Sequence, residues 1–236
     1  MKNKQEIRKK IWNLFEEKNI STFPRPVHGR IPNFIGANVA AEKLNELSIW
    51  KKARIIKSNP DSPQKWVRQE ALKHGKTVYM AVPRLRKDEC FLKINPKKIP
   101  SINQASTIKG AFKYGEKVGP DEMDTVDIII IGSVAVNKKG AKIGKGGGFS
   151  DLEYAIGKEF DIVSENTPTI STVHPLQILD HELPMEGHDV PLDYIVTRDK
   201  IIKTNTSYVK PKGINWNIIG DKINEIPLLQ KLKKGV

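Results

Sequence analysis

The stretch of this sequence that is most informative for chemistry is Gly144-Lys145-Gly146-Gly147-Gly148, with four glycines in five residues. Glycine has no Cβ, so the backbone amides of such a loop can approach a ligand closely. A helix is expected directly after the loop, and its N-terminus favours a bound phosphate. The spacing matches neither the P-loop nor the dinucleotide fingerprint, because Phe149 stands where the latter needs its third glycine. The pattern therefore indicates either a phosphate-binding loop or a plain flexible turn.

Asp151 follows this loop near the expected start of the helix. Asp is a preferred N-cap residue, and its carboxylate is also the hard oxygen ligand that Mg²⁺ takes, so both roles stay open. In either role, Asp151→Asn is expected to leave the stability of the ligand-free protein unchanged, because no buried group loses a partner. Further along, His188 and Asp189 are adjacent in a loop that contains Pro184 and Pro191. Such a pair by itself is usually a hydrogen-bonded surface pair.

Three further groups of residues are candidates for binding or catalysis. Arg84 and Arg86 come just after a predicted strand. The carboxyl ends of strands face ligands in open α/β sheets, so both are candidates for binding an anionic substrate. Arg25, His28 and Arg30 lie in a long loop rich in Pro and Gly, where they either grip an anion or decorate the surface. The five histidines lack zinc-ligand spacing, and the single cysteine, Cys90, excludes a cysteine-rich zinc module and is expected to be inert.

An alternation of helices and strands must position these residues. Apolar residues at helical spacing predict helices over 2–18 and 40–47, and proline and glycine at its two ends support another over 63–74. After the glycine loop, a fourth helix is predicted over 152–160. The predicted strands cover 54–57, 77–82, 126–136, 167–173 and 194–197.

The apolar run VDIIIIGSVAV over 126–136 is predicted to be one central parallel strand buried on both faces. Strands that alternate with helices indicate an α/β fold with a mostly parallel sheet. The simplest organisation is a single domain over 1–236. It has an N-terminal helical arm over 1–50 and an irregular C-terminal tail over about 206–236.

Composition and charge narrow the function classes. Of the 236 residues, 38% are hydrophobic and 28% charged, which is typical of a soluble globular protein. No apolar run approaches the roughly 20 residues of a membrane span, and the start MKNKQEIRKK is not a secretory signal, so a cytoplasmic location is expected. Residues 1–118 carry 26 Lys and Arg against 10 Asp and Glu, whereas residues 119–236 carry 14 against 17. The basic half suits either a polyanion, such as a nucleotide or RNA, or a solvated surface.

Taken together, the motifs resemble one family. VDIIIIGSVAVNKKGAKIGKGGGFSD, then QILDHELPMEGHDVPLDYIVT, and the pair Lys4-x-x-x-Arg8 look like the 5-formyltetrahydrofolate cyclo-ligase (methenyltetrahydrofolate synthetase) family. The resemblance covers about residues 4–203. PRPVHGRIPNF, NPDSPQK and PRLR resemble a divergent branch of the family, that of the methenyltetrahydrofolate synthetase domain-containing proteins.

The resemblance implies a three-layer α/β/α sandwich of the NagB/ribose-5-phosphate isomerase/CoA-transferase type. It implies ATP and Mg²⁺ as cofactors, with Asp151 and Asp189 as metal ligands, and Asp61 and Arg84 at the second substrate. The implied ATP-binding residues are Lys4, Arg8, Lys142, Gly144, Lys145, Gly146, Gly147, Gly148 and Phe149. Among them, Lys142 and Lys145 would be catalytic. The implied reaction converts 5-formyltetrahydrofolate, or a related N-formyl pterin, to the 5,10-methenyl form, with ATP giving ADP and phosphate.

The chain departs from the family pattern more at the folate end than at the nucleotide end. Lys142 stands for an arginine, which keeps the charge but not the bidentate geometry, and Asp61 stands for a glutamate. Gly132-Ser133 replaces Pro-Gly, and Phe149-Ser150 replaces paired tyrosines. These changes predict that ATP binding is retained and that the specificity for folate is weakened. The alternative is a non-catalytic nucleotide- or RNA-binding protein that keeps the fold. Either is expected to be a monomer or homodimer that does not enter a membrane.

Overall fold

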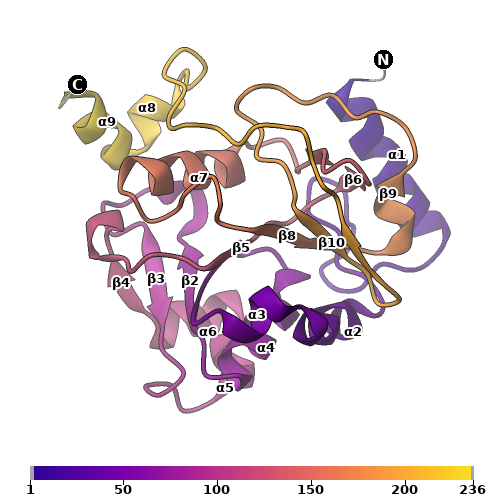
Figure 1. Cartoon of the computed structure of the whole chain (residues 1–236), viewed down its shortest axis with the longest axis horizontal. Coiled ribbons are helices and arrows are strands. Elements are labelled where there is room, and N and C mark those ends of the chain that lie inside the picture. Colours follow the sequence, from indigo (N-terminus) through magenta and orange to yellow (C-terminus); the bar gives the residue numbers. More distant parts are fainter. Residues whose placement is uncertain (1–2, 235–236) are drawn as a thin grey trace.

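An eight-stranded sheet forms the centre of the computed structural model, which describes residues 3–234 (Figure 1). The strand order is β11-β10-β8-β5-β1-β2-β3-β4. The strands from β10 to β2 in this order are parallel to one another, and the pairs at the two edges are antiparallel. The predicted, mostly parallel sheet is therefore confirmed. The strands are β1 (Ile55–Ser58), β2 (Thr77–Ala81), β3 (Phe91–Ile94), β4 (Glu116–Val118), β5 (Ile128–Ile130), β8 (Thr169–Thr172), β10 (Tyr194–Val196) and β11 (Ile201–Lys203).

Helices cover both faces of this sheet, as the predicted three-layer sandwich requires (Figure 1). Ile129 and Ile131 pack into the core beneath α7, whereas Ile128 and Ile130 pack into the core beneath α2–α6. This alternation follows from the period of two along a strand, and it explains why the isoleucine block is apolar throughout. One face carries α7 (Phe149–Glu159), α8 (Lys222–Glu225) and α9 (Pro227–Lys234). The other carries α2 (Ala37–Glu42), α3 (Ser48–Lys52), α4 (Gln64–Lys73), α5 (Ile102–Ala105) and α6 (Ile108–Tyr114). Four 3₁₀ turns are η1 (Lys43–Glu46), η2 (Pro83–Leu85), η3 (Pro120–Glu122) and η4 (Pro175–Gln177).

A second, three-stranded sheet lies beside the first and packs against α1 (Lys4–Glu17). Its order is β7-β6-β9, with β6 over Ala135–Asn137, β7 over Lys142–Ile143 and β9 over Ile178–Leu179. The prediction of one strand over 126–136 was therefore wrong. The chain leaves the large sheet after β5 and re-pairs as β6 in the small one. The turn between them contains Gly132, where a Cβ would meet the side-chain oxygens of Gln64 and Asp61 at 3.0 and 3.1 Å. Both strands are buried, so the apolar pattern carries no sign of the break.

The C-terminal tail, predicted to be irregular over about 206–236, is irregular as far as residue 221, but over the described residues 222–234 it is mostly helical. There α8 and α9 form, and Ile226 and Leu229 are fully buried in the core beneath α7. The backbone amide of Ile214 donates to Glu159 at the end of α7 at 2.8 Å. The tail therefore lies along α7. Residues 83–125 also contain two strands and two helices that were not predicted.

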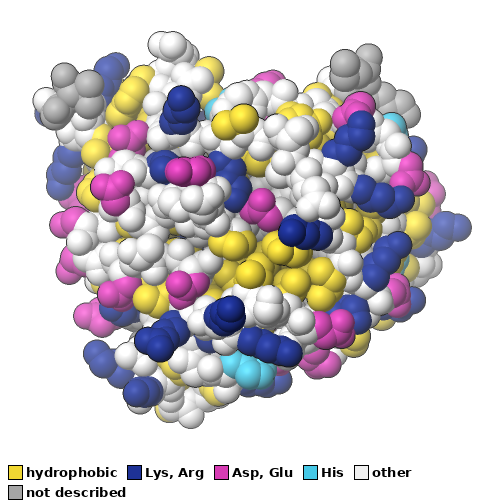
Figure 2. Space-filling model, viewed as in Figure 1, with side chains coloured by type: hydrophobic (Ala, Val, Ile, Leu, Met, Phe, Trp, Pro, Cys, Tyr) yellow, Lys and Arg dark blue, Asp and Glu magenta, His cyan; other side chains and the backbone are white. Residues whose placement is uncertain are grey.

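The surface mixes charges of both signs. On the face drawn in Figure 2, Lys and Arg are spread among Asp and Glu around a central group of hydrophobic side chains. The basic excess of residues 1–118 thus forms no continuous positive region on this face. Among residues 3–234, no helix combines the length and apolar composition that crossing a membrane would need.

Candidate active site

A cavity of about 530 Å³ lies at the carboxyl ends of the parallel strands β1, β2 and β5. The segments that follow these strands form one side of it, and the glycine loop with the start of α7 forms the other. Open α/β sheets bind ligands at this edge. The sequence-predicted residues that line the cavity are Asp61, Arg84, Lys142, Gly144, Lys145, Gly146, Gly147, Gly148, Phe149 and Asp151.

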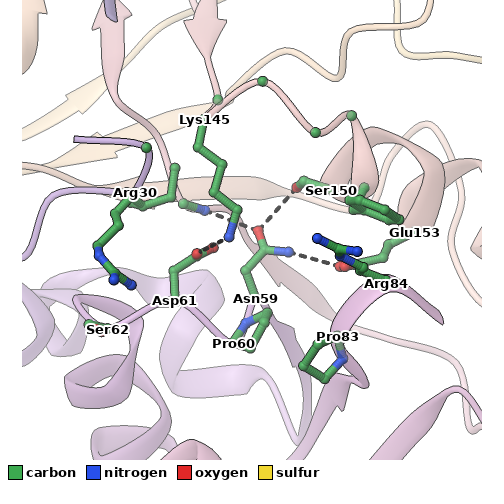
Figure 3. Close-up of a pocket in the computed structure, with 18 of the residues that line it drawn as sticks. Arg30, Asn59, Pro60, Asp61, Ser62, Pro83, Arg84, Lys145, Ser150 and Glu153 are labelled. Atoms are coloured by element: carbon green, nitrogen blue, oxygen red, sulfur yellow. Dashed lines mark hydrogen bonds and ion pairs between the residues drawn. The ribbon is translucent and has the colours of Figure 1, made fainter. Parts of the chain in front are cut away.

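Asn59 is the structural centre of this cavity (Figure 3). Its side-chain oxygen accepts from the amide of Gly132 and from the hydroxyl of Ser150, both at 3.0 Å. Its side-chain nitrogen donates to Glu153 at 2.8 Å. One amide thus ties β1, the turn after β5 and α7 together. Its backbone carbonyl accepts from the fully buried Arg68 at 2.6 Å, and burial lowers the pKa of this guanidinium to about 10.

Beneath Asn59, Lys57 on β1 donates to Glu153 on α7, and both side chains are buried. Burial raises the pKa of Glu153, and the charge of Lys57 opposes this effect. A buried carboxylate needs such a partner, because an unpaired charge in the interior is very costly. The pair fixes α7 over the end of β1, and with it the glycine loop that precedes α7.

Lys145 reaches from the glycine loop across the cavity to Asp61, with Nζ 2.7 Å from Oδ1 (Figure 3). Arg30 and Arg84 lie on opposite sides of Asn59 in the same view. Arg84 has the left-handed backbone conformation, with φ of +61°, which is costly for a residue with a side chain and recurs at functional sites. Four cations (Arg30, Arg84, Lys142 and Lys145) and three carboxylates (Asp61, Asp151 and Glu153) line the cavity. Each carboxylate is already paired with a lysine, so the two arginines supply positive charge suited to an anionic ligand.

Of the three candidates in the long loop, only Arg30 lines the cavity. Arg25 donates to the carbonyl of Ser21, and His28 contacts the side chain of Asn13 at 2.8 Å. Nothing in the sequence separates these three residues, since all are polar and lie in the same irregular segment.

Lys142 and Asp151 form an ion pair at 2.8 Å, and the Lys142 side chain is only 2% exposed. Asp151 also accepts from the amide of Val190 at 2.9 Å. The interpretation of Asp151 as the N-cap was wrong: the cap of α7 is Gly148, with φ of +68°, and Asp151 lies in the first turn. Its carboxylate is used for the long-range contacts and not for the free amides of the helix.

A second cluster lies behind the glycine loop. Lys4 at the start of α1 donates to Asp189 at 2.6 Å, and Arg8 donates to the carbonyl of Gly144 at 2.7 Å. Burial lowers the pKa of Arg8, and Asp189 acts in the opposite direction. Gly146 has φ of +109°, a backbone conformation that residues with a side chain rarely adopt. A Cβ there would lie 3.4 Å from the Arg8 guanidinium carbon, an ordinary van der Waals contact, so the backbone conformation and not the contact with Arg8 calls for glycine. Of the two predicted ATP-binding cations of α1, Arg8 thus contacts the glycine loop and Lys4 contacts Asp189, and neither lines the large cavity.

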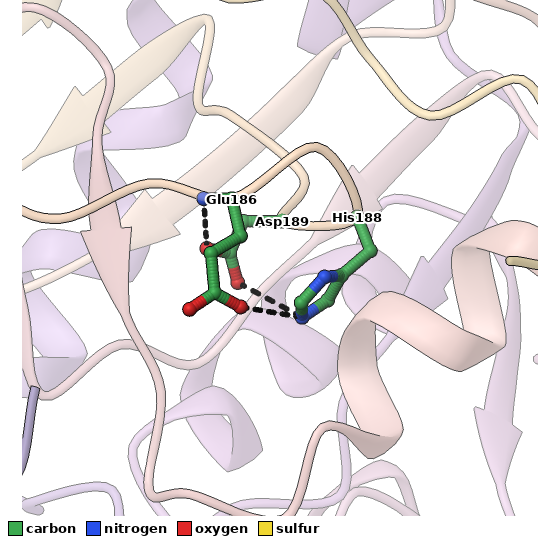
Figure 4. A group of neighbouring side chains, drawn as sticks. All are labelled: Glu186, His188 and Asp189. Atoms are coloured by element: carbon green, nitrogen blue, oxygen red, sulfur yellow. Dashed lines mark hydrogen bonds and ion pairs between the residues drawn. The ribbon is translucent and has the colours of Figure 1, made fainter. Parts of the chain in front are cut away.

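Glu186, His188 and Asp189 place one ligand atom each within 4.8 Å of one another (Figure 4). The His188 Nε2 lies 3.4 Å from Glu186 and 3.9 Å from Asp189. Asp151 is not part of this group among the described residues. The pairing of Asp151 with Asp189 at one magnesium ion therefore stays a prediction.

The residues around the loop have the chemical groups that a nucleoside triphosphate and Mg²⁺ would need. Free amides at the start of an 11-residue helix, a left-handed glycine cap and a half-exposed lysine suit phosphate oxygens. The carboxylates of Asp151 and Asp189 are the hard oxygen donors that Mg²⁺ takes. Each carboxylate already forms an ion pair with a lysine, so a bound metal ion would either coordinate the carboxylate beside that lysine or displace the lysine.

Sequence reasoning missed four residues that organise the site, namely Asn59, Arg68, Lys57 and Glu153. In the sequence, Asn59 is noted only as the first residue of the NPDSPQK motif, with no role of its own at the site. The sequence signal for Lys57 is a lysine within an apolar strand, and for Glu153 a glutamate on the apolar face of a helix. Charged residues are rarely buried unless they are paired, so such positions indicate a buried ion pair.

This fold, with a glycine loop opposite the ends of β1 and β2, is that of the methenyltetrahydrofolate synthetases. The solved structure of Aquifex aeolicus 5,10-methenyltetrahydrofolate synthetase superimposes with a TM-score of 0.54 over 86% of this chain and 94% of its own, at 20% identity. The sequence profile of the 5-formyltetrahydrofolate cyclo-ligase family matches residues 1–198. The chain belongs to this family, as its motifs predicted.

Relatives in the family share more of the sequence. Methenyltetrahydrofolate synthase domain-containing proteins are 42% identical in Bos taurus and 41% in Danio rerio, each over 98% of this chain. The chain spans 62% and 61% of the length of these two relatives. The predicted divergent branch is confirmed. None of these matches favours the alternative of a non-catalytic nucleotide- or RNA-binding protein.

Proposed function

We propose that this chain is a Mg·ATP-dependent cyclo-ligase that acts on 5-formyltetrahydrofolate or a related N-formyl pterin. In this reaction the γ-phosphoryl group of ATP moves to the N5-formyl oxygen, and ADP leaves. N10 of the pterin then attacks the activated carbon, the imidazoline ring closes, and phosphate leaves with the former formyl oxygen. The product is the 5,10-methenyl form.

The observation that supports this proposal most directly is the single cavity that places the glycine loop opposite Asp61 and Arg84. Phosphoryl transfer between two substrates requires mainly that both be held in line and that the charge on the moving group be neutralised. The loop side of the cavity offers amides and Lys145 for phosphate. The strand side offers the carboxylate of Asp61 to hydrogen-bond the pterin ring and the guanidinium of Arg84 to bind a negatively charged part of the substrate.

Lys145 is the residue that joins the two sides. Its side chain is 43% exposed and pairs with Asp61 at 2.7 Å, so a substrate that hydrogen-bonds to Asp61 would free the ammonium for the transferred phosphoryl group. Lys142 is buried and holds Asp151, so its proposed contribution is to position the start of α7. No step of this reaction needs a protein nucleophile, and Cys90 is buried.

A coupled ADP-release assay tests the proposal. The purified chain is mixed with Mg·ATP and 5-formyltetrahydrofolate or other formylated pterins, and both ADP and the methenyl product are followed. We expect ADP release that requires a formylated pterin and equals the methenyl product formed. Lys145→Gln should lower kcat/KM by roughly 100-fold, since it removes a charge that acts on the transition state.

Lys139→Gln is the matched control. Lys139 is also an exposed lysine before the glycine loop, and it is paired with a carboxylate, Glu182, but it does not line the cavity. Its variant should retain wild-type kinetics. Absence of pterin-dependent ADP release from the wild-type chain, together with no heat of Mg·ATP binding at millimolar nucleotide, would refute the proposed function.

A further inference from the structure

A second cavity of about 210 Å³ lies on the other side of the start of α7. Gly148 and Asp151 line both this cavity and the larger one. The first turn of α7 is therefore the shared wall between two spaces. A ligand in the smaller cavity can present one end to the glycine loop without entering the space proposed for the pterin.

The C-terminal segment supplies the apolar wall of this smaller cavity. Ile214, Ile218 and Ile219 line it, with the polar side chain of Asn215 beside them. These residues lie outside the stretch that matches the family profile, which ends at residue 198. The wall is thus a part of this chain that the common family pattern does not supply.

A cation closes the end of the cavity next to the glycine loop. Lys222 lines it, and its Nζ lies 3.6 Å from where a Cβ on Gly148 would be. The same nitrogen lies 6.0 Å from the centroid of the Phe149 ring. The ammonium is therefore held over the N-terminal turn of α7, where free amides already favour negative charge. Asp151 and Glu186 line the cavity as well. Because these carboxylates repel an anion, an anion bound here would need a metal cation bound beside it.

We infer that this cavity binds the base and ribose of the nucleotide, with Lys222 as an additional phosphate ligand contributed by the C-terminal tail; the inference rests on the proposed function. An apolar wall and a cation beside helix amides, both lining one cavity, match a molecule with a flat heteroaromatic base and a phosphate chain. The shared wall at Gly148 then lets the terminal phosphate reach the larger cavity while the base stays in the smaller one.

Calorimetric titration with two probes, Mg·ATP and Mg-tripolyphosphate, tests this assignment. The wild-type chain should bind Mg·ATP more tightly, because only ATP has a base. Lys222→Gln should weaken both probes by roughly 10- to 100-fold, since a charge-assisted hydrogen bond is lost from each. Ile218→Gln should weaken Mg·ATP several-fold and leave tripolyphosphate unchanged, because it alters only the apolar wall.

Lys233→Gln is the matched control, because Lys233 is an exposed lysine on α9 of the same tail. It should bind both probes as the wild type does. Ile218 is 47% exposed, so its variant should melt as the wild type does without ligand, which separates a binding defect from unfolding. Wild-type Mg·ATP binding that neither Lys222→Gln nor Ile218→Gln changes would overturn the assignment and leave the proposed function standing. Absence of Mg·ATP binding to the wild type would overturn both.

Discussion

The ion pair between Lys142 and Asp151 makes Asp151→Asn a sharp test of how the site is built. From sequence alone the variant is expected to leave the ligand-free protein unchanged. In the structure, however, the Asp151 carboxylate is 2.8 Å from the Nζ of Lys142, whose side chain is 2% exposed. Asparagine keeps the shape and an acceptor oxygen but removes the negative charge. The lysine is then left buried beside a neutral group.

The expected cost follows from that burial. Breaking a buried pair by removing one partner costs about 3–5 kcal/mol. Because Asn still accepts hydrogen bonds from Lys142 and from the amide of Val190, we expect the lower end of this range or slightly less, about 2–3 kcal/mol. For a chain of this length, such a loss lowers the melting temperature by about 5–10 °C.

Thermal and urea denaturation without nucleotide measure this effect. Glu165→Gln is the control, because Glu165 forms an exposed ion pair with Lys158 at 3.3 Å, and exposed pairs contribute little to stability. A melting temperature for Asp151→Asn that stays within about 1 °C of the wild type would refute the reasoning. The same variant with Mg·ATP tests the predicted metal ligand: equal stabilisation by Mg·ATP in variant and wild type would show that Asp151 does not hold Mg²⁺.

Two further predictions concern titratable groups outside the cavity, the buried Cys90 and the partly buried His174. Burial raises the pKa of Cys90 to about 12, so the native protein should resist thiol labelling at pH 8 and react fully only in denaturant; fast labelling of the native state would contradict this. Burial, reinforced by the charge of Arg198, lowers the pKa of His174 below its ordinary 6.5. The unfolded chain therefore takes up this proton first, and the free energy of unfolding should fall as pH drops below 6.5. His174→Asn should flatten that slope in pH-dependent urea denaturation, and an unchanged slope would contradict the assignment.

The sequence by itself determined the local structure around the site. Helical spacing of apolar residues placed α1, and proline and glycine at the two ends placed α4, within a few residues of their observed ends, because both signals are properties of neighbouring positions. The cluster of glycines before α7 identified the loop, because backbone freedom depends only on the residues present. The ordered motifs also identified the family, since they are read along the chain.

Only the tertiary structure decided which side chains meet. Lys57 and Glu153 are 96 positions apart and become partners only when α7 packs over β1. Asp151 has the sequence context of an N-cap, yet its carboxylate forms an ion pair with the buried Lys142 of β7. The hydrophobic periodicity of the C-terminal tail is weak. Its isoleucines form a wall beside Gly148 only because they pack against the apolar face of α7. In each case the pairing is set by the free energy of burying distant groups together, which no local pattern contains.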